Sequence, residues 1–227
     1  MAESVIAYAL TALRKIPDYL ERTRNGGWYE NGEVWEGLLD QTVGIIGFGM
    51  TSRHLFRMGK AFRLKFKVLE KPYLTEDVQK EYGFETASLE EIFRTCKIVS
   101  LHCGMTKSYY HLVDERLLGM MPDGALLINT ARGPVIDEQA LIAELKRGRI
   151  RAVLDVYEEE DAYFFEDKSN DIITDEDLIR LTSFRNVVLT SHQAFFTKDA
   201  MEAIAKVTLE NARAVEEGLE LKNRVLP

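Results

Sequence analysis

Short apolar runs that alternate with helical segments constrain the fold of this chain more than any other feature. Six runs are candidate strands: Val43–Ile46, Phe66–Leu69, Ile98–Leu101, Ala125–Asn129, Ala152–Asp155 and Val187–Thr190. Helical stretches lie between them, near 75–82, 88–95, 114–121 and 137–147. Strands that alternate with helices over short connections form parallel sheets. We therefore predict an α/β fold with a six-stranded, doubly wound parallel sheet.

Other segments frame this predicted sheet. Residues 2–24 place apolar side chains at helical spacing, which predicts one amphipathic helix whose stripe needs a partner surface. Residues 25–39 are rich in glycine and aromatic residues and predict a loop. Residues 157–182 are acidic and aromatic, and we interpret them as a long functional loop with a short helix near 175–181. Residues 199–217 predict a last amphipathic helix, which in its simplest interpretation packs against the sheet or the first helix.

Charge and apolar run lengths exclude several classes of protein. The formal net charge is −8, which leaves no basic surplus for a nucleic acid partner. No apolar run approaches the ~20 residues that span a bilayer, and acidic residues interrupt the first 24 residues where a secretory signal would be apolar. We expect a cytoplasmic protein. Cys96 and Cys103 lack metal-ligand or CxxC spacing, so we expect buried thiols, no disulfide and no metal.

A glycine-rich turn after the first predicted strand indicates a dinucleotide site. Gly47 permits a tight turn, Gly49 lets the backbone approach a pyrophosphate, and Met50 and Thr51 open a helix whose N-terminus attracts anions. Ser52 stands where a third glycine is usual, at a position that needs only a small residue for helix–strand packing. The alternative interpretation is a tight strand–helix turn without a ligand. In this context we predict a Rossmann-like domain that binds NAD.

The second predicted strand ends beside an acidic residue at the expected distance from the glycines. Glu70 is placed to accept hydrogen bonds from the adenosine ribose, and its charge would repel a 2′-phosphate. This favours NAD over NADP, although the adjacent Lys71 weakens the preference.

Three ordered motifs in the second half of the chain resemble those of the D-isomer-specific 2-hydroxyacid dehydrogenases. They are Leu127–Glu138 (LINTARGPVIDE), Leu154–Glu160 (LDVYEEE) and Asn186–His192 (NVVLTSH). The stretch 155–171 (DVYEEEDAYFFEDKSND) is similar to the bacterial D-lactate dehydrogenase branch of this family. The resemblance runs from about Glu3 to the end. The sequence departs from the family pattern at two places. His102-Cys103-Gly104 lacks the proline usual after this strand, and Asp161 stands where the family usually has a proline after Glu160.

The resemblance implies three catalytic residues, and their chemistry suits those roles. Arg132 would hold the substrate carboxylate or carbonyl, because a planar guanidinium can form paired hydrogen bonds with it. His192 would be the general acid/base, since histidine titrates near neutral pH. Glu160 would orient His192 and stabilise its charged form. Singly, such an Arg is more often a surface ion-pair partner, and the Glu158–Glu160 run more often a solvated face.

Further cofactor contacts are implied by the same resemblance. Thr130 and Ala131 would line the cofactor, and Asp155, at a strand end, would lie near the nicotinamide. The other three histidines, His54, His102 and His111, have no such motif around them.

The chain begins at what resembles the helix between the two domains of this family, so we expect the substrate domain to be largely absent. We divide the chain into an interdomain or dimerisation helix (1–24), the NAD-binding domain (25–197) and a C-terminal helix and tail (198–227). The expected function is hydride transfer between NADH and a small 2-keto acid such as pyruvate, in a homodimer. The alternative is a truncated or engineered NAD-binding, dimerising module with little or no turnover, paired through the apolar stripe of residues 5–20.

Overall fold

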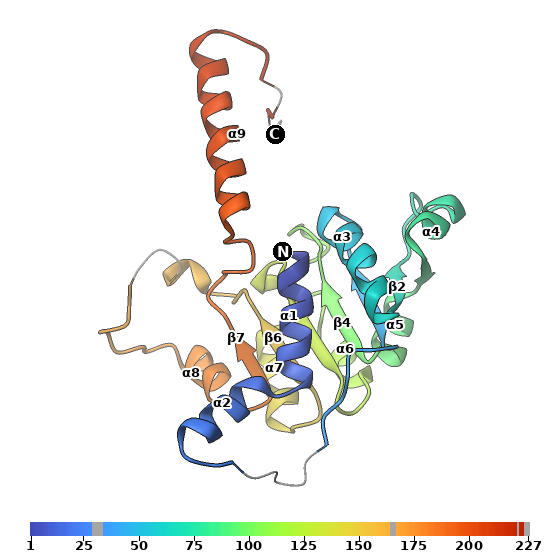
Figure 1. Cartoon of the computed structure of the whole chain (residues 1–227), viewed down its shortest axis with the longest axis vertical. Helices are drawn as coiled ribbons and strands as arrows, with labels where there is room; N and C mark the ends of the chain where they lie inside the picture. Colours follow the sequence, from blue (N-terminus) through green and yellow to red (C-terminus); the bar gives the residue numbers. More distant parts are fainter. Residues whose placement is uncertain (29–33, 164–166, 222, 225–227) are drawn as a thin grey trace. The chain divides into compact units, whose positions relative to one another are not determined.

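A seven-stranded parallel sheet is the centre of the protein, in a computed structural model that describes residues 1–28, 34–163, 167–221 and 223–224 (Figure 1). The strands are β1 (Thr42–Ile46), β2 (Lys65–Leu69), β3 (Phe84–Ala87), β4 (Ile98–Leu101), β5 (Leu126–Asn129), β6 (Arg151–Leu154) and β7 (Val187–Leu189). Their order is β3-β2-β1-β4-β5-β6-β7. Every paired neighbour is parallel, which confirms the predicted doubly wound fold. Within the described ranges no second sheet is present.

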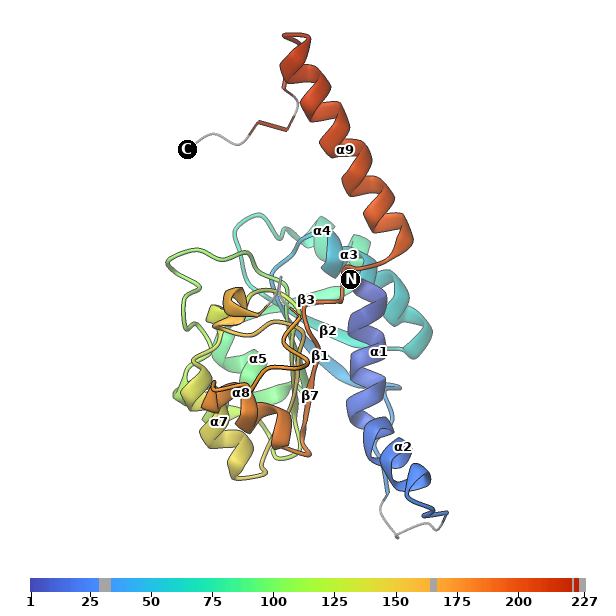
Figure 2. The same ribbon diagram turned by 90° about the vertical axis from the view of Figure 1, so that its left-hand side faces the viewer.

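Helices cover both faces of this sheet. Their bounds are α1 (Ala2–Leu13), α2 (Ile16–Arg24), α3 (Met50–Gly59), α4 (Glu76–Tyr82), α5 (Leu89–Thr95), α6 (Glu115–Met120), α7 (Glu138–Lys146) and α8 (Glu176–Ser183). One apolar layer joins α1, α3 and α4 to the sheet, and another joins α5, α6, α7 and α8 to its opposite face (Figure 2). Because both faces are covered, the central strands β4 and β5 are buried throughout, as an all-parallel sheet requires.

The chain divides into two compact units, Met1–His192 and Gln193–Pro227. The first contains the whole sheet and also α1, which we expected to be a separate interdomain element. The second contains α9 (Lys198–Glu216), close to the helix predicted over 199–217. Thr197 caps α9 by accepting a hydrogen bond from the backbone N–H of Ala200. None of the described helices could cross a membrane.

Two predictions of secondary structure were wrong in detail. The edge strand β3 was not predicted, because it is only four residues long and carries the polar pair Glu85-Thr86. The helix predicted over 2–24 is broken into α1 and α2, because Lys15 adopts a left-handed conformation with φ of 45° and Pro17 can only begin a new helix.

The apolar stripe of α1 is not available to a second copy of the chain. Val5, Ala9 and Leu13 are at most 4% exposed and pack on the sheet. The alternative of dimerisation through the stripe of residues 5–20 therefore fails for the α1 part, while Ile16 and Leu20 of α2 remain exposed.

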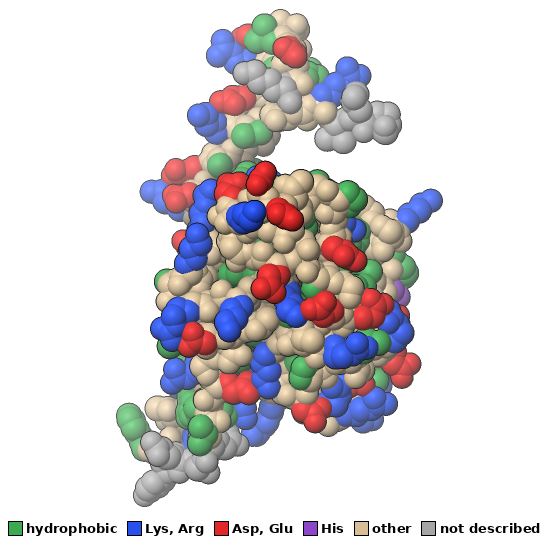
Figure 3. Space-filling view, turned by 90° about the vertical axis from the view of Figure 1, so that its right-hand side faces the viewer, with side chains coloured by type: hydrophobic (Ala, Val, Ile, Leu, Met, Phe, Trp, Pro, Cys, Tyr) green, Lys and Arg blue, Asp and Glu red, His purple; other side chains and the backbone are tan. Residues whose placement is uncertain are grey.

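Surface charge is mixed where it is visible in Figure 3. Acidic and basic side chains are interspersed over the face on the side of α4. Exposed pairs such as Lys80 with Glu76 and Arg116 with Glu90 contribute little to stability, since water screens them.

Candidate active site

The glycine turn has the geometry that close approach of a pyrophosphate requires. Gly47 has φ of 110°, and a Cβ there would meet the carbonyl carbon and oxygen of His102 at 2.6 Å. At Gly49 a Cβ would meet nothing within 4 Å, so open space lies before the N-terminus of α3. Met50 and Thr51 form the first turn of that helix, whose backbone N–H groups lack partners within the helix. The turn therefore offers donors and room to an anion.

Ser52 explains why the third glycine is dispensable. Its side chain is fully buried, and its hydroxyl donates a hydrogen bond of 2.7 Å to the carbonyl oxygen of Gly47. Ser52, at the position of the usual third glycine, therefore stabilises the turn by this hydrogen bond. Its side chain is buried and does not project into the open side of the turn.

Glu70 lies directly after β2, on the edge of the sheet where the glycine turn also lies. Its backbone N–H donates to Ala87, and the residue is exposed. The ammonium group of Lys71 lies 5.5 Å from the centroid of the Tyr109 ring, a cation–π distance.

Thr130 shows that the site suits a polar ligand. It is 4% exposed, and its hydroxyl is buried without a hydrogen-bond partner among the described residues. A buried hydroxyl without a partner costs roughly 1–3 kcal/mol, so its presence calls for an acceptor or donor that completes it. The neighbouring Ala131 is also buried, and its N–H donates to the side chain of Asn129. Together with the open turn at Gly49, Thr130 fits a dinucleotide at this edge.

The structure brings His192 and Glu160 together although 32 residues separate them. Nδ1 of His192 lies 3.1 Å from Oε1 of Glu160, and both side chains are largely buried. The other carboxylate oxygen, Oε2, accepts a hydrogen bond from the backbone N–H of Tyr157. The pair borders a cavity of about 330 Å³ that is otherwise lined mainly by tyrosine and leucine side chains. Two contacts therefore hold the Glu160 carboxylate beside the imidazole of His192.

Asp155 is linked to His192 through its backbone, while its carboxylate accepts hydrogen bonds from two hydroxyl groups. Its Oδ1 accepts hydrogen bonds from the hydroxyls of Tyr8 at 2.9 Å and Thr190 at 2.6 Å. Its backbone carbonyl accepts the N–H of His192 at 2.7 Å, and His192 adopts a left-handed φ of 54°. Burial and the neighbouring Asp155 raise the pKa of Tyr8 to about 12, so Tyr8 remains a donor. No role was predicted for Thr190, although it lies in the motif Asn186–His192, and Tyr8 lies in no motif at all.

Arg132 follows β5 and is exposed, and the structure shows no contact between it and the His192–Glu160 pair. Its Nη1 donates to the carbonyl of Ala131 at 2.6 Å. The next residue, Gly133, packs so closely on the backbone of Tyr157 and Glu158 that a Cβ would collide with both. The loop of Arg132 therefore lies against the loop that leads to Glu160, at the carboxyl ends of adjacent strands β5 and β6.

Two histidines outside the three motifs, His102 and His111, have side-chain partners. Nε2 of His111 lies 2.8 Å from Oε1 of Glu158, so Glu158 is not simply a solvated residue. Nε2 of His102 lies 2.9 Å from the Ser100 hydroxyl, and burial lowers the pKa of His102 to about 4. Within the described ranges no cluster of His, Cys, Asp and Glu side chains could hold a metal ion.

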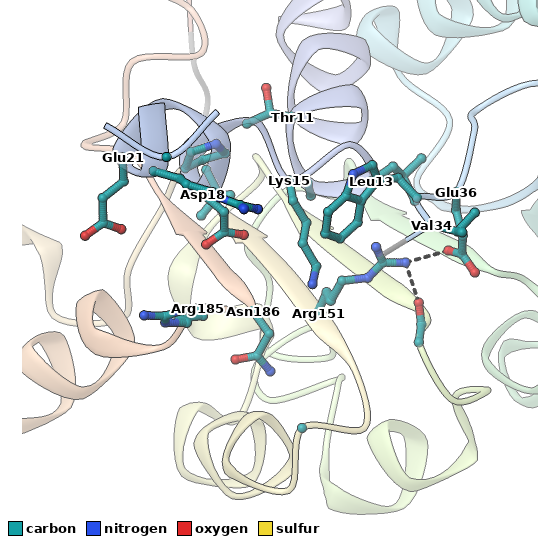
Figure 4. Close-up of a pocket in the computed structure, with 18 of the residues that line it drawn as sticks. Thr11, Leu13, Lys15, Asp18, Glu21, Val34, Glu36, Arg151, Arg185 and Asn186 are labelled. Atoms are coloured by element: carbon teal, nitrogen blue, oxygen red, sulfur yellow. Dashed lines mark hydrogen bonds and ion pairs between the residues drawn. The ribbon is translucent and has the colours of Figure 1, made fainter. Parts of the chain in front are cut away.

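A cavity of about 950 Å³ lies at the opposite, amino-terminal edge of the sheet (Figure 4). Its wall includes Arg151, which donates hydrogen bonds to Glu36 and to the carbonyl of Gly124. Parallel sheets bind ligands beyond the carboxyl ends of their strands, so this cavity is not the expected catalytic site. Trp35 Nε1 and Arg151 Nε are nevertheless buried there without an acceptor among the described residues.

Comparison with known proteins agrees with this geometry. Residues 6–194 match the NAD binding domain of the D-isomer specific 2-hydroxyacid dehydrogenases. A 2-hydroxyacid dehydrogenase homolog of Haemophilus influenzae is 38% identical and the D-lactate dehydrogenase of Escherichia coli is 36% identical; each match covers all of this chain and 68% of the relative.

Solved structures show the same relationship. A D-lactate dehydrogenase from Treponema pallidum has a TM-score of 0.89 at 31% identity, over 100% of this chain and 68% of that one. A D-lactate dehydrogenase from Aquifex aeolicus, solved with NAD and lactic acid, has a TM-score of 0.87 at 29% identity, over 96% of this chain and 66% of that one. The chain thus spans about two thirds of the length of these relatives. It belongs to the D-isomer-specific 2-hydroxyacid dehydrogenases, and the part it shares with them includes their NAD-binding domain.

Proposed function

We propose that this chain carries the cofactor site and the acid/base pair of an NAD-dependent dehydrogenase that interconverts a small 2-keto acid and its D-2-hydroxy acid. The observation that carries the proposal is the contact between His192 and Glu160 at the carboxyl edge of a sheet that also presents the glycine turn. Pyruvate and D-lactate are the candidate substrates, because relatives of this chain are D-lactate dehydrogenases.

NADH would be held by the turn at Gly47 and Gly49 with the first turn of α3, by Glu70 at the ribose and by Thr130 nearer the reacting ring. Ala131 and Asp155 would line the nicotinamide end. Bound NADH supplies the hydride for the carbonyl carbon.

Proton transfer falls to His192. Its Nδ1 faces Glu160, so Nε2 is the nitrogen that would deliver a proton to the substrate carbonyl oxygen as hydride arrives at carbon. The Glu160 carboxylate stabilises the charged imidazole before delivery and keeps the ring in one orientation. In the reverse direction His192 takes the proton from the hydroxyl group. The guanidinium of Arg132 would hold the substrate carboxylate. Because the side chain is exposed, it can turn toward a bound substrate.

A paired assay tests the proposal. NADH binding is measured by fluorescence titration, and NADH oxidation is measured with a panel of 2-keto acids, for the wild type and His192→Ala. We expect His192→Ala to lower kcat by about 10²- to 10⁴-fold, the usual contribution of general acid/base catalysis, with an unchanged Kd for NADH. Equal turnover by the two proteins would contradict the proposal. Binding without turnover by the wild type would leave the alternative of an NAD-binding module.

We also propose that the protein is a cytoplasmic homodimer. Exposed apolar side chains support dimerisation, because Leu20 of α2 is 52% exposed, and Trp28 and Val34, which follow α2 in the chain, are 84% and 93% exposed. The free, buried thiols of the two cysteines suit a reducing compartment. Light scattering should give the dimer mass at micromolar concentration and a smaller mass for Leu20→Asp; a monomeric wild type would exclude the dimer.

A further inference from the structure

The loops that carry Arg132 and Glu160 are joined by a residue outside the catalytic set. His111 lies in the segment after β4, and its ring contacts Glu158, two residues before Glu160. Its backbone N–H donates to the carbonyl of Pro134 at 2.8 Å, two residues after Arg132. One residue therefore contacts both catalytic loops.

The contact between His111 and Glu158 is specific and sheltered. The distance from Nε2 to Oε1 is 2.8 Å, and the two side chains are 31% and 18% exposed. The His111 ring also stacks on Tyr110, with centroids 4.0 Å apart and planes 14° from parallel. Stacking on one side and a carboxylate at the edge leave the imidazole little rotational freedom.

The backbone of this segment is held in an uncommon conformation. His111 has φ of 48°, a left-handed value that non-glycine residues adopt only where the surroundings impose it. Val113 then continues the contact, because its N–H donates to Val135 and its carbonyl accepts from Asp137. The segment thus runs alongside the Arg132 loop, where Val113 and Ile136 form an isolated parallel bridge, and the left-handed backbone of His111 accompanies the contact of its ring with Glu158.

The two catalytic loops also contact each other directly, and their backbones lie too close for an added side-chain atom at Gly133. Gly133 has no room for a Cβ against the Tyr157 carbonyl and the Glu158 N–H. Tyr157 in turn donates its own N–H to Glu160. A shift of the Glu158 backbone would therefore reach Glu160 through Tyr157, and through Glu160 it would reach Nδ1 of His192.

We propose that His111 is a positioning residue that fixes the Arg132 loop to the Glu160 loop through its contact with Glu158, and so keeps the substrate-binding and proton-transfer groups in register. This inference rests on the proposed function for its catalytic consequence. Independently of catalysis, loss of the contact between His111 and Glu158 should change the tautomer of His192, which can be measured without turnover. The glycine turn at Gly47 lies outside this contact, so cofactor affinity should depend on it weakly.

The test compares the wild type with His111→Gly, which fits the left-handed backbone, and His111→Gln, which keeps a donor for Glu158. His54→Gln on exposed α3 is the matched control. Histidine ¹⁵N spectra of the neutral ring report the share of His192 in the Nδ1–H tautomer that faces Glu160. We expect His111→Gly to lower that share and to reduce kcat/KM for the keto acid by about 10- to 100-fold, mainly through KM, with NADH affinity within about threefold.

His111→Gln should restore most of both readouts, and His54→Gln should change neither. Unchanged His192 signals and unchanged kcat/KM in folded His111→Gly would overturn the proposal. If the wild type shows no turnover, the proposed function fails, while the His192 spectra still decide this inference. If His111→Gly does not fold, Glu158→Ala removes the acceptor of the same contact and should change the His192 spectra and kcat/KM in the same way. Unchanged readouts in folded Glu158→Ala would overturn the proposal.

Discussion

Replacing Glu138 by Gln should make the protein more stable at alkaline pH and leave its stability almost unchanged at acidic pH. Glu138 is in the first turn of α7 and half-buried. Burial raises the pKa of its carboxyl group from 4.5 to about 7, and the negative charges of Asp177, Glu158 and Asp175 add to this, against a hydrogen bond from the Glu158 backbone. The folded protein therefore holds this proton more tightly than the unfolded chain does.

The direction of the effect follows from that difference. Well below pH 4.5 the Glu138 carboxyl is protonated in both the folded and the unfolded state and does not change the stability. As the pH rises from about 4.5 to about 7, the unfolded chain loses the proton first, and the folded state is progressively destabilised. A pKa change of this size corresponds to about 3 kcal/mol at about 1.4 kcal/mol per tenfold change in acid dissociation. Because water screens a half-buried group, we expect about 1–2 kcal/mol above pH 7.

The assay is urea unfolding at about pH 4 and about pH 8, followed by circular dichroism, with free energies from linear extrapolation. Glu115→Gln is the matched control, because Glu115 also follows a capping aspartate at the start of a helix but is exposed. Both variants lose the same favourable charge at a helix N-terminus, so their difference isolates burial. If Glu138→Gln changed the unfolding free energy equally at the two pH values, the burial argument would be refuted.

Three further predictions concern the cofactor turn and its supports. Gly47→Ala should weaken NADH binding at least about tenfold in a fluorescence titration, because alanine rarely adopts the φ of this position and its Cβ would collide with His102. Gly119→Ala in α6, where a Cβ meets open space, should leave the affinity unchanged, and equal affinities of the two variants would contradict the prediction. Tyr8→Phe should lower the free energy of unfolding by about 1–2 kcal/mol in urea, through the lost hydrogen bond to Asp155, and no change would show that this bond is dispensable. Thr130→Val should stabilise the cofactor-free protein by up to about 1 kcal/mol while weakening NADH binding about two- to tenfold, and tighter binding would argue against a cofactor contact.

Local patterns predicted most of the architecture. Each of the six predicted strands is present to within one residue at either end, and the glycine turn lies between β1 and α3 as expected. Two helix caps are equally local, since the side chain of Ser88 accepts from the backbone N–H of Glu91 and that of Asp137 accepts from the backbone N–H of Ala140. These features depend on neighbours within a few residues, so the sequence alone determines them.

The candidate site was predictable only as far as its motifs are local. Sequence position placed Arg132, Glu160 and His192 after successive strands, and parallel order then requires them at one edge. It could not show that Tyr8 would complete Asp155 from 147 residues away, because that contact depends on how α1 packs across the sheet.

The chain by itself therefore determined which segments become strands and helices, which turn is open to a dinucleotide, and which residue types stand at the strand ends. Only the tertiary structure decided that the helix over 2–24 breaks at Lys15, that α1 buries its apolar stripe on the sheet, and that His111 meets Glu158. The physical reason is range: periodicity, caps and turns are set by adjacent residues, whereas hydrogen bonds and burial between distant segments exist only once the sheet has brought those segments together.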